Sequence, residues 1–166
     1  MRAVRRDTFE RLYAEHAEAL LGFLIYRTAD RPLAEDLLSD TFERAIKARR
    51  RFDRRKASEK TWLYSIALNC LRDHQRREGA EERAYQLAAA DAVDTAPDPA
   101  PTVEARDAVS RALEGVSDEE RDALALRYGA DLSVPEIAKL TGLKESTARG
   151  RIYGAMRKLR DELEDG

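Results

Sequence analysis

Apolar residues in the first half of the chain recur at the spacing of amphipathic helices. Within residues 8–26 and again within 33–46, large apolar side chains return every three or four positions, which places them on one face of a helix. Asp30 stands where an N-cap belongs and Pro32 suits the following first turn, so we expect the second helix to begin there. A third apolar stripe runs through residues 62–71. Three such helices can cover one another, which predicts a small helical bundle.

The last third of the chain predicts a second group of helices. Ser117 and Ser133 each begin an S-x-x-E capping box, and apolar residues at helical spacing follow both. Residues 141–143, Thr-Gly-Leu, predict a tight turn, and a long basic helix is expected over 145–163. Ala138 is small where the two helices would cross. A short helix, a turn containing glycine and a second helix are typical of a helix-turn-helix.

Composition changes between the two helical parts. The stretch 80–108 is acidic and rich in alanine, and three prolines alternate near its end. It has too little apolar surface to offset the entropy of ordering, so we predict a linker between domains at 1–79 and 109–166. No segment shows the alternation of a strand. The expected fold is all-α, with an N-terminal helical bundle and a C-terminal helix-turn-helix bundle joined by an acidic Pro/Ala-rich linker.

Charge is distributed unevenly along the 166 residues, although the formal net charge is only −2. Basic residues dominate the stretch 44–60 and the polar side of the third predicted helix. Such a concentration is typical of contact with a nucleic-acid backbone. Aromatic residues at Phe52, Trp62 and Tyr64 could stack on unpaired bases, and packing in the core is the alternative interpretation.

Other classes of function find little support. No apolar run is long enough to span a membrane, and no secretory signal opens the chain, so a cytoplasmic protein is expected. Cys70 and His74 have the i,i+4 spacing of two metal ligands, but two are too few for a structural zinc site. We therefore expect no metal, no cofactor, no small-molecule substrate and no enzymatic activity.

The second helix of the predicted helix-turn-helix has an outward face suited to DNA. Arg149 could donate two parallel hydrogen bonds to a guanine edge. Arg151, Arg157 and Lys158 suit phosphates. An ordinary helical hairpin with a solvated basic face is the alternative. The outward or contacting set comprises Lys144, Ser146, Thr147, Arg149, Gly150, Arg151, Tyr153 and Arg157.

Taken together, four motifs resemble the extracytoplasmic-function (ECF) group of sigma factors of bacterial RNA polymerase. They are Phe9-x-x-Leu12-Tyr13-x-x-His16, the segment from Ala34 to Phe42 (AEDLLSDTF), Phe52 followed by the segment from Trp62 to Asn69 (WLYSIALN), and the helix-turn-helix through Arg160.

This resemblance implies a factor that directs polymerase to promoters and assists strand opening. Its N-terminal domain would bind the clamp of the large polymerase subunit and the −10 element, and its C-terminal domain would bind the flap and the −35 element. An anti-sigma factor is a further partner class found among such proteins. The resemblance assigns polymerase binding to Asp36, Ser39, Asp40 and Phe42, and −10 binding to Phe52, Arg54, Arg55, Lys56, Ser58, Asn69, Arg72 and Arg76.

Two positions depart from the family's usual pattern. Many relatives carry Gly-Ser-aromatic where this chain has Ala57-Ser58-Glu59, and many carry Arg where Gly154 stands. A glycine inside a helix costs about 1 kcal/mol relative to alanine and here removes a DNA donor. The alternative function is a helix-turn-helix regulator that acts without being a polymerase subunit.

Overall fold

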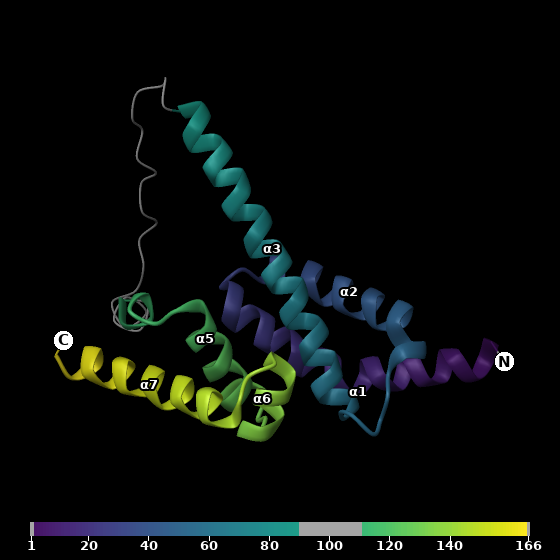
Figure 1. Ribbon diagram of the computed structural model, residues 1–166. Coiled ribbons are helices and arrows are strands. Elements are labelled where there is room, and N and C mark those ends of the chain that lie inside the picture. The colour runs from purple at the N-terminus through teal and green to yellow at the C-terminus, as the bar shows by residue number, and fades with distance from the viewer. Residues whose placement is uncertain (1, 90–110, 166) are drawn as a thin grey trace.

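The computed structural model describes residues 2–89 and 111–165, and within these ranges it contains helices and no strands (Figure 1). The elements in order are α1 (Arg2–Thr28), α2 (Arg31–Ala48), η1 (Arg49–Arg51), α3 (Glu59–Ala89), α5 (Asp118–Leu124), η2 (Ala125–Gly129), α6 (Val134–Thr141) and α7 (Glu145–Glu164). The all-α prediction is therefore confirmed. Most of the predicted linker, residues 90–108, lies outside the described residues.

The first three helices pack on one another as the apolar stripes predict. Asp30 caps α2, because its Oδ1 accepts a hydrogen bond from the Leu33 backbone N–H at 3.2 Å. The turn before it places Ala29 at a φ of 53°, which allows α2 to fold back from α1. Each fully buried leucine contributes about 1.5–3 kcal/mol relative to an exposed one. The leucines with at most 2% exposure in this bundle are Leu20, Leu24, Leu37, Leu63, Leu68 and Leu71.

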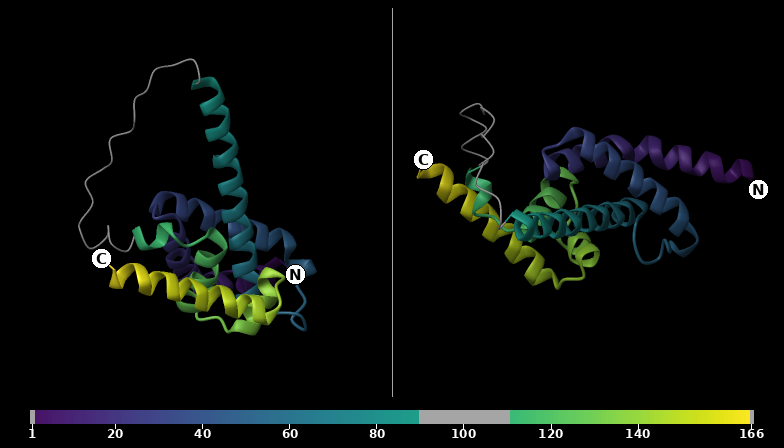
Figure 2. Two further views of the ribbon diagram at one scale, coloured as in Figure 1. Left: turned by 60° about the vertical axis from the view of Figure 1, so that its left-hand side comes forward. Right: turned by 90° about the horizontal axis from the view of Figure 1, so that it is seen from above.

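Helix α3 continues into the stretch predicted as a linker, where the sequence left a short helix within residues 81–90 open. It runs through Gly79 to Ala89 and projects away from the rest of the molecule (Figures 1 and 2). Residues 80–88 are all exposed. Alanine, glutamate, arginine, glutamine and leucine in this segment are strong helix formers, so local propensity rather than packing extends the helix. Arg83 Nε also donates to the Gly79 carbonyl at 3.1 Å.

The two predicted capping boxes behave differently. Ser117 and Glu120 form the full reciprocal pair, with the Glu120 N–H to Ser117 Oγ at 3.2 Å and the Ser117 N–H to Glu120 Oε2 at 3.0 Å. Ser133 caps α6 in the same way through the Glu136 N–H at 3.3 Å. The Glu136 carboxylate, however, accepts from the Ser133 hydroxyl at 2.8 Å instead of from its backbone N–H, so only half of this box forms.

The helix-turn-helix has the expected geometry. Gly142 ends α6 at a φ of 72°, a left-handed conformation that glycine adopts without steric cost. The Ala138 carbonyl accepts from both Gly142 and Leu143, which closes the turn. Ala148 and Ile152 of α7 are 0% and 3% exposed and join the core that Ala138 enters from α6.

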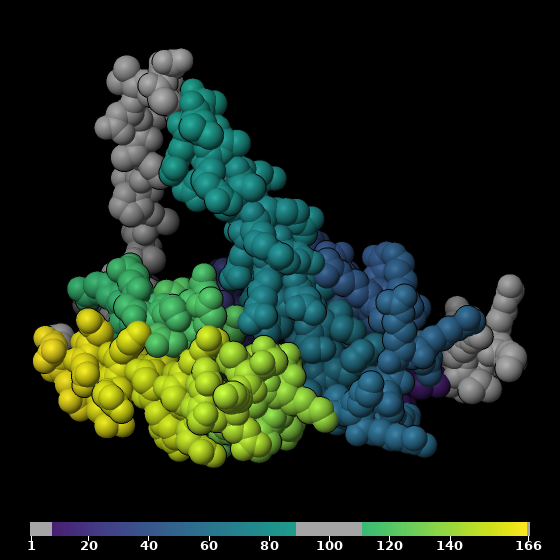
Figure 3. Space-filling view, in the orientation of Figure 1, coloured from purple at the N-terminus to yellow at the C-terminus, as the bar shows by residue number. Residues whose placement is uncertain are grey.

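Both halves of the chain share one continuous hydrophobic core. Leu20 and Leu24 of α1 belong to the same buried cluster as Leu126, Leu132 and Ile137 of the C-terminal half. Helix α1 contacts η2, and α3 contacts α6. Figure 3 shows the surface of the C-terminal helices meeting that of α3 along one side of the bundle. The two halves are thus packed together, an arrangement that sequence patterns alone left open.

Two glycine substitutions test the helix-turn-helix geometry. Gly142→Ala should lower the free energy of unfolding by about 1 kcal/mol, because a Cβ is strained at positive φ. Gly154→Ala should raise it by about 0.5–1 kcal/mol, since the added Cβ meets nothing within 4 Å apart from the adjoining residues and backbone of its own helix, and alanine is the better helix former. Urea unfolding of both variants measures the difference, and equal effects would contradict the assigned turn.

Candidate nucleic-acid interface

An aromatic pair lines a cavity at the start of α3. The rings of Phe52 and Trp62 lie 4.7 Å apart between centroids and 32° from parallel. Both side chains are partly exposed, so they pack against the core on one side and face a cavity of about 570 Å³ on the other. A cavity lined by aromatic, aliphatic and basic side chains suits a nucleobase with its phosphates. Its lining is Thr8, Phe9, Leu12, Ala45, Ile46, Arg49, Arg50, Phe52, Arg54, Glu59 and Trp62.

The loop beside this cavity is a compact turn rather than a flexible stretch. Asp53 Oδ1 accepts from the Arg55 N–H at 2.9 Å, and the Asp53 carbonyl accepts from the Lys56 N–H at 3.0 Å. Ser58 Oγ accepts from the Thr61 N–H at 3.1 Å and thereby caps α3. The loop presents Arg55 and Lys56 to solvent. The serine that we assigned to DNA therefore has a structural role already.

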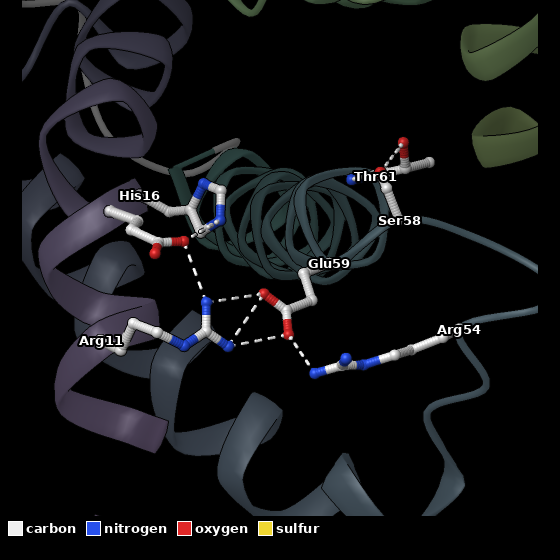
Figure 4. A network of polar contacts seen from close by, with 7 residues as sticks. Arg11, His16, Arg54, Ser58, Glu59 and Thr61 are labelled. Carbon is white, nitrogen blue, oxygen red and sulfur yellow. Dashed lines mark hydrogen bonds and ion pairs between the residues drawn. The ribbon is translucent and has the colours of Figure 1, made fainter. Parts of the chain in front are cut away.

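Glu59 ties the loop to α1 (Figure 4). The guanidinium of Arg11 donates to both carboxylate oxygens of Glu59, at 3.0 Å and 3.2 Å, and Arg54 donates to the same carboxylate at 3.1 Å. The hydrogen bonds from Arg11 hold the pKa of Glu59 below its ordinary value. Arg54, a predicted DNA contact that lines the cavity, is therefore held by an acidic residue.

The same network contains the one group of metal-ligating side chains found among the described residues. Oxygens of Glu15 and Glu59 and a ring nitrogen of His16 all lie within 4.8 Å of one another. The Arg11 guanidinium lies between the two carboxylates, 3.0 Å from Glu15 and 3.0 Å from Glu59. A cation already occupies the position where a metal would bind, and the chemistry of the cluster is that of an ion-pair network.

Further along α3, the other predicted −10 residues form a polar stripe. Asn69, Arg72 and Arg76 follow at intervals of three and four residues, about 10–20 Å beyond Trp62 at the rise of an α-helix. Arg76 pairs with Asp73, and Arg72 Nη2 lies 3.7 Å from Asp122 Oδ2 of α5. A second hollow of about 540 Å³ opens between this stripe and the start of α5.

The recognition helix presents its predicted face to solvent. Thr147, Arg149, Gly150 and Tyr153 are exposed on α7, Tyr153 at 61%. Lys144, Ser146 and Arg157 are exposed as well, and Arg151 is partly buried. Every predicted −35 contact therefore remains accessible while the two halves are packed together.

The predicted polymerase contacts on α2 include both exposed and buried residues. Asp36, Ser39 and Asp40 are exposed on its outer face. Phe42 is only 3% exposed and packs edge-on against Phe9, with ring centroids 5.9 Å apart. Its position on the helix points inward with the apolar stripe, beneath the outer face that carries the other three residues. Its assignment to polymerase binding stays a prediction.

Two charged residues that sequence reasoning missed lie between the halves. Arg27 of α1 and Asp122 of α5 have side chains only 3% and 5% exposed, and Arg27 Nε donates to Asp122 Oδ1 at 2.7 Å. Burial raises the pKa of Asp122, and Arg27 and Arg72 offset that only in part. The sequence contains one indication of this ion pair, because each residue occupies a core-facing position in a helical stripe that is otherwise apolar.

Cys70 offers no reactive thiolate. It is 1% exposed, and burial raises the pKa of its thiol, which keeps it protonated and poorly nucleophilic. Within residues 2–89 and 111–165, no helix combines the length and apolarity needed to cross a bilayer.

Both halves of the chain match families of known proteins. Residues 12–81 match the family Sigma-70 region 2, and residues 106–159 match Sigma-70, region 4. The chain is 34% identical to the RNA polymerase sigma factor CarQ of Myxococcus xanthus, covering 95% of this chain and 90% of that protein. It is 28% identical to the ECF RNA polymerase sigma factor BldN of Streptomyces coelicolor, covering 96% of this chain but only 61% of BldN.

A solved structure supports the arrangement of both halves. The sigma factor RpoE of Bartonella quintana, in complex with the anti-sigma factor NepR, superposes with a TM-score of 0.74 at 25% identity, covering 95% of this chain and 97% of that one. Two region matches in the expected order, together with relatives along nearly the whole chain, place this protein in the ECF group of RNA polymerase sigma factors.

Proposed function

We propose that this chain is the promoter-recognition subunit of an RNA polymerase holoenzyme, acting in the cytoplasm and contributing no covalent chemistry of its own. The observation that carries this proposal is the presence on one chain of an exposed recognition helix and a separate aromatic cavity with a basic rim. A protein that binds only duplex DNA needs only the exposed recognition helix. The aromatic cavity suits a protein that also binds bases after they leave the duplex. The two parts correspond to residues 2–89 and 111–165.

The cavity between α1, α2 and the loop is the proposed site for an unpaired base of the −10 element. Phe52 and Trp62 would supply the stacking surface, and Arg54, Arg55 and Lys56 would neutralise the neighbouring phosphates. Base–aromatic stacking contributes about 1–3 kcal/mol per base. Binding of a base that has left the stack lowers the free energy of the separated strands. In this way a protein that hydrolyses no nucleotide can still assist the melting of promoter DNA.

Helix α7 is the proposed reader of the −35 duplex. Its exposed face carries Arg149, whose guanidinium fits the paired acceptors of guanine in the major groove. Arg151 and Arg157 would contact phosphates and set the register of the helix. Gly154 offers no side chain, so this chain has one donor fewer on α7 than relatives with arginine there.

The exposed acidic face of α2 is the proposed contact with core polymerase. Asp36 and Asp40 would be repelled by DNA, so a protein surface is the better partner, and Ser39 lies between them. The relative in Bartonella quintana was solved with an anti-sigma factor. A partner of that class is proposed here too, bound where both halves of the chain are within reach.

Transcription with purified core polymerase tests the proposed function. The chain should direct a specific run-off transcript from a promoter of its own host, and core polymerase alone should not. Asp36→Lys/Asp40→Lys should abolish the transcript without weakening DNA binding by the chain, because the acidic face is assigned to polymerase. Tight DNA binding without association with core polymerase would instead identify a regulator that is not a polymerase subunit.

Arg149→Ala should weaken discrimination at one base of the −35 element by about 1–3 kcal/mol, because it removes a bidentate contact to a base edge. Competition binding by the holoenzyme against single-base variants of the promoter measures this. Arg157→Ala is the matched control and should weaken all sequences about equally. A uniform loss for Arg149→Ala would mean that Arg149 contacts only phosphate.

Glu59→Gln should lower the urea midpoint at neutral pH, because the amide loses the ion pairs that tie the loop to α1. The pKa of Glu59 is lowered in the folded state, so its contribution is present above its ordinary value of 4.5 and disappears as pH falls through the lower folded value. The difference between wild type and variant should therefore vanish in acid. Glu15→Gln, which leaves Arg11–Glu59 intact, is the control, and a difference that persisted in acid would point to packing.

A further inference from the structure

Two arginines share one carboxylate beside the cavity that Trp62 lines. The Glu59 carboxylate accepts hydrogen bonds from Arg11 of α1 and from Arg54 of the loop (Figure 4). Arg54 lines the cavity and is proposed to contact a DNA phosphate, whereas Arg11 does not line the cavity. We infer that Arg11 is a positioning residue, which keeps Glu59 occupied and thereby leaves the guanidinium of Arg54 available to the DNA strand. This inference rests on the proposed function, since it concerns the same −10 site.

Arg11 binds Glu59 at two points. Its Nη1 donates to Oε2 at 3.2 Å and its Nη2 donates to Oε1 at 3.0 Å, the parallel geometry in which a guanidinium and a carboxylate match best. The same Nη1 donates to Glu15 Oε2 at 3.0 Å, one turn further along α1, which gives the guanidinium a second anchor. The hydrogen bonds from Arg11 are the largest cause that lowers the pKa of Glu59, ahead of the charge of Arg54. Arg11 is therefore the main partner of this carboxylate.

Arg54 makes a weaker contact with the same carboxylate. Its Nη2 donates at 3.1 Å to Oε1, the oxygen that Arg11 Nη2 also reaches, and its side chain is 76% exposed. A guanidinium carries several N–H donors in a planar fork, so one contact leaves most of them to solvent or to a phosphate. In the folded chain Arg54 is thus directed by Glu59 without being neutralised by it.

Loss of Arg11 would change the main partner of Glu59. Arg54 already touches this carboxylate, so an unoccupied Glu59 can turn both of its oxygens toward Arg54. A two-point pair of that kind would compete with DNA, because carboxylate and phosphate bind the same fork of donors. Arg11 can prevent this pairing because α1 is fixed from the other side, where Phe9 and Leu12 pack against the core.

Two other roles of Arg11 make different predictions. If Arg11 only tied α1 to α3, removal of Glu59 as well would not repair the loss of Arg11. If Arg11 contacted a phosphate directly, removal of Glu59 would not replace that contact either. A positioning role predicts repair, because the carboxylate that competes for Arg54 is then absent.

Binding of the holoenzyme to the labelled non-template strand of a promoter that it transcribes tests the inference. Arg11→Ala should weaken binding about fivefold in 0.1 M salt and reduce the dependence of log Kd on log salt by about 0.7, the value of one phosphate contact on a single strand. Arg11→Ala/Glu59→Gln should restore both quantities to those of the wild type. Arg11→Ala/Glu15→Gln is the matched control, because it has the same net charge but leaves Glu59 free to pair with Arg54, and it should stay as weak as Arg11→Ala.

Modification of Arg54 in the free full-length chain is a second readout, which needs neither polymerase nor DNA. Phenylglyoxal treatment followed by peptide mass spectrometry measures the rate at which Arg54 reacts. The rate should fall about twofold in Arg11→Ala, the factor expected if the pair with Glu59 forms half of the time. Glu59→Gln should restore the rate in the double variant, and Glu15→Gln should not.

Repair by Glu15→Gln as well as by Glu59→Gln would indicate a general effect of charge and would overturn the inference, as would repair by neither. An Arg54 that reacts at the same rate in all variants would also overturn it. The run-off transcript reports separately on the proposed function. Its absence with the wild-type chain refutes the sigma function, whereas the reactivity of Arg54 still decides whether Arg11 controls the pairing of Glu59.

Discussion

Helix α3 contributes side chains to three different surfaces, and the arrangement of the other helices depends on its position. One face carries Leu63, Leu68 and Leu71 into the core that joins both halves of the chain. Its first turn supplies Trp62 to the cavity and Glu59 to the network with α1. Its polar side carries the stripe that begins at Asn69. Because side chains three or four residues apart share a face, one helix can hold all three surfaces in a fixed relation.

The core and the polar contacts between the halves play different roles. Apolar burial of residues such as Leu24 and Leu126 is favourable without a particular geometry, and it accounts for why the halves associate at all. The ion pair of Arg27 and Asp122 favours one relative orientation of the halves, because its charges are stable in the interior only when they face one another. Charged groups at such positions favour one arrangement of the halves over others that would bury similar apolar area.

Several residues with a predicted binding role also have partners within the chain. Ser58 and Arg54 are predicted to bind DNA, and in the folded chain Ser58 caps a helix and Arg54 pairs with Glu59. Phe42 is predicted to bind polymerase, and it is buried beneath the exposed face of α2. Each residue has chemistry suited to more than one partner, and the partner it finds within the chain depends on helices distant in sequence.

Sequence by itself determined the local features. The helices at 31–48 and 134–141, their caps at Asp30 and Ser133, the turn at Gly142 and the exposed face of α7 all follow from period, capping and backbone chemistry, which act over a few residues. Tertiary structure alone decided how the halves pack, because that depends on which apolar faces and charges meet across a long separation in the chain. The same reason explains why the cavity beside Trp62 could not be predicted from the sequence.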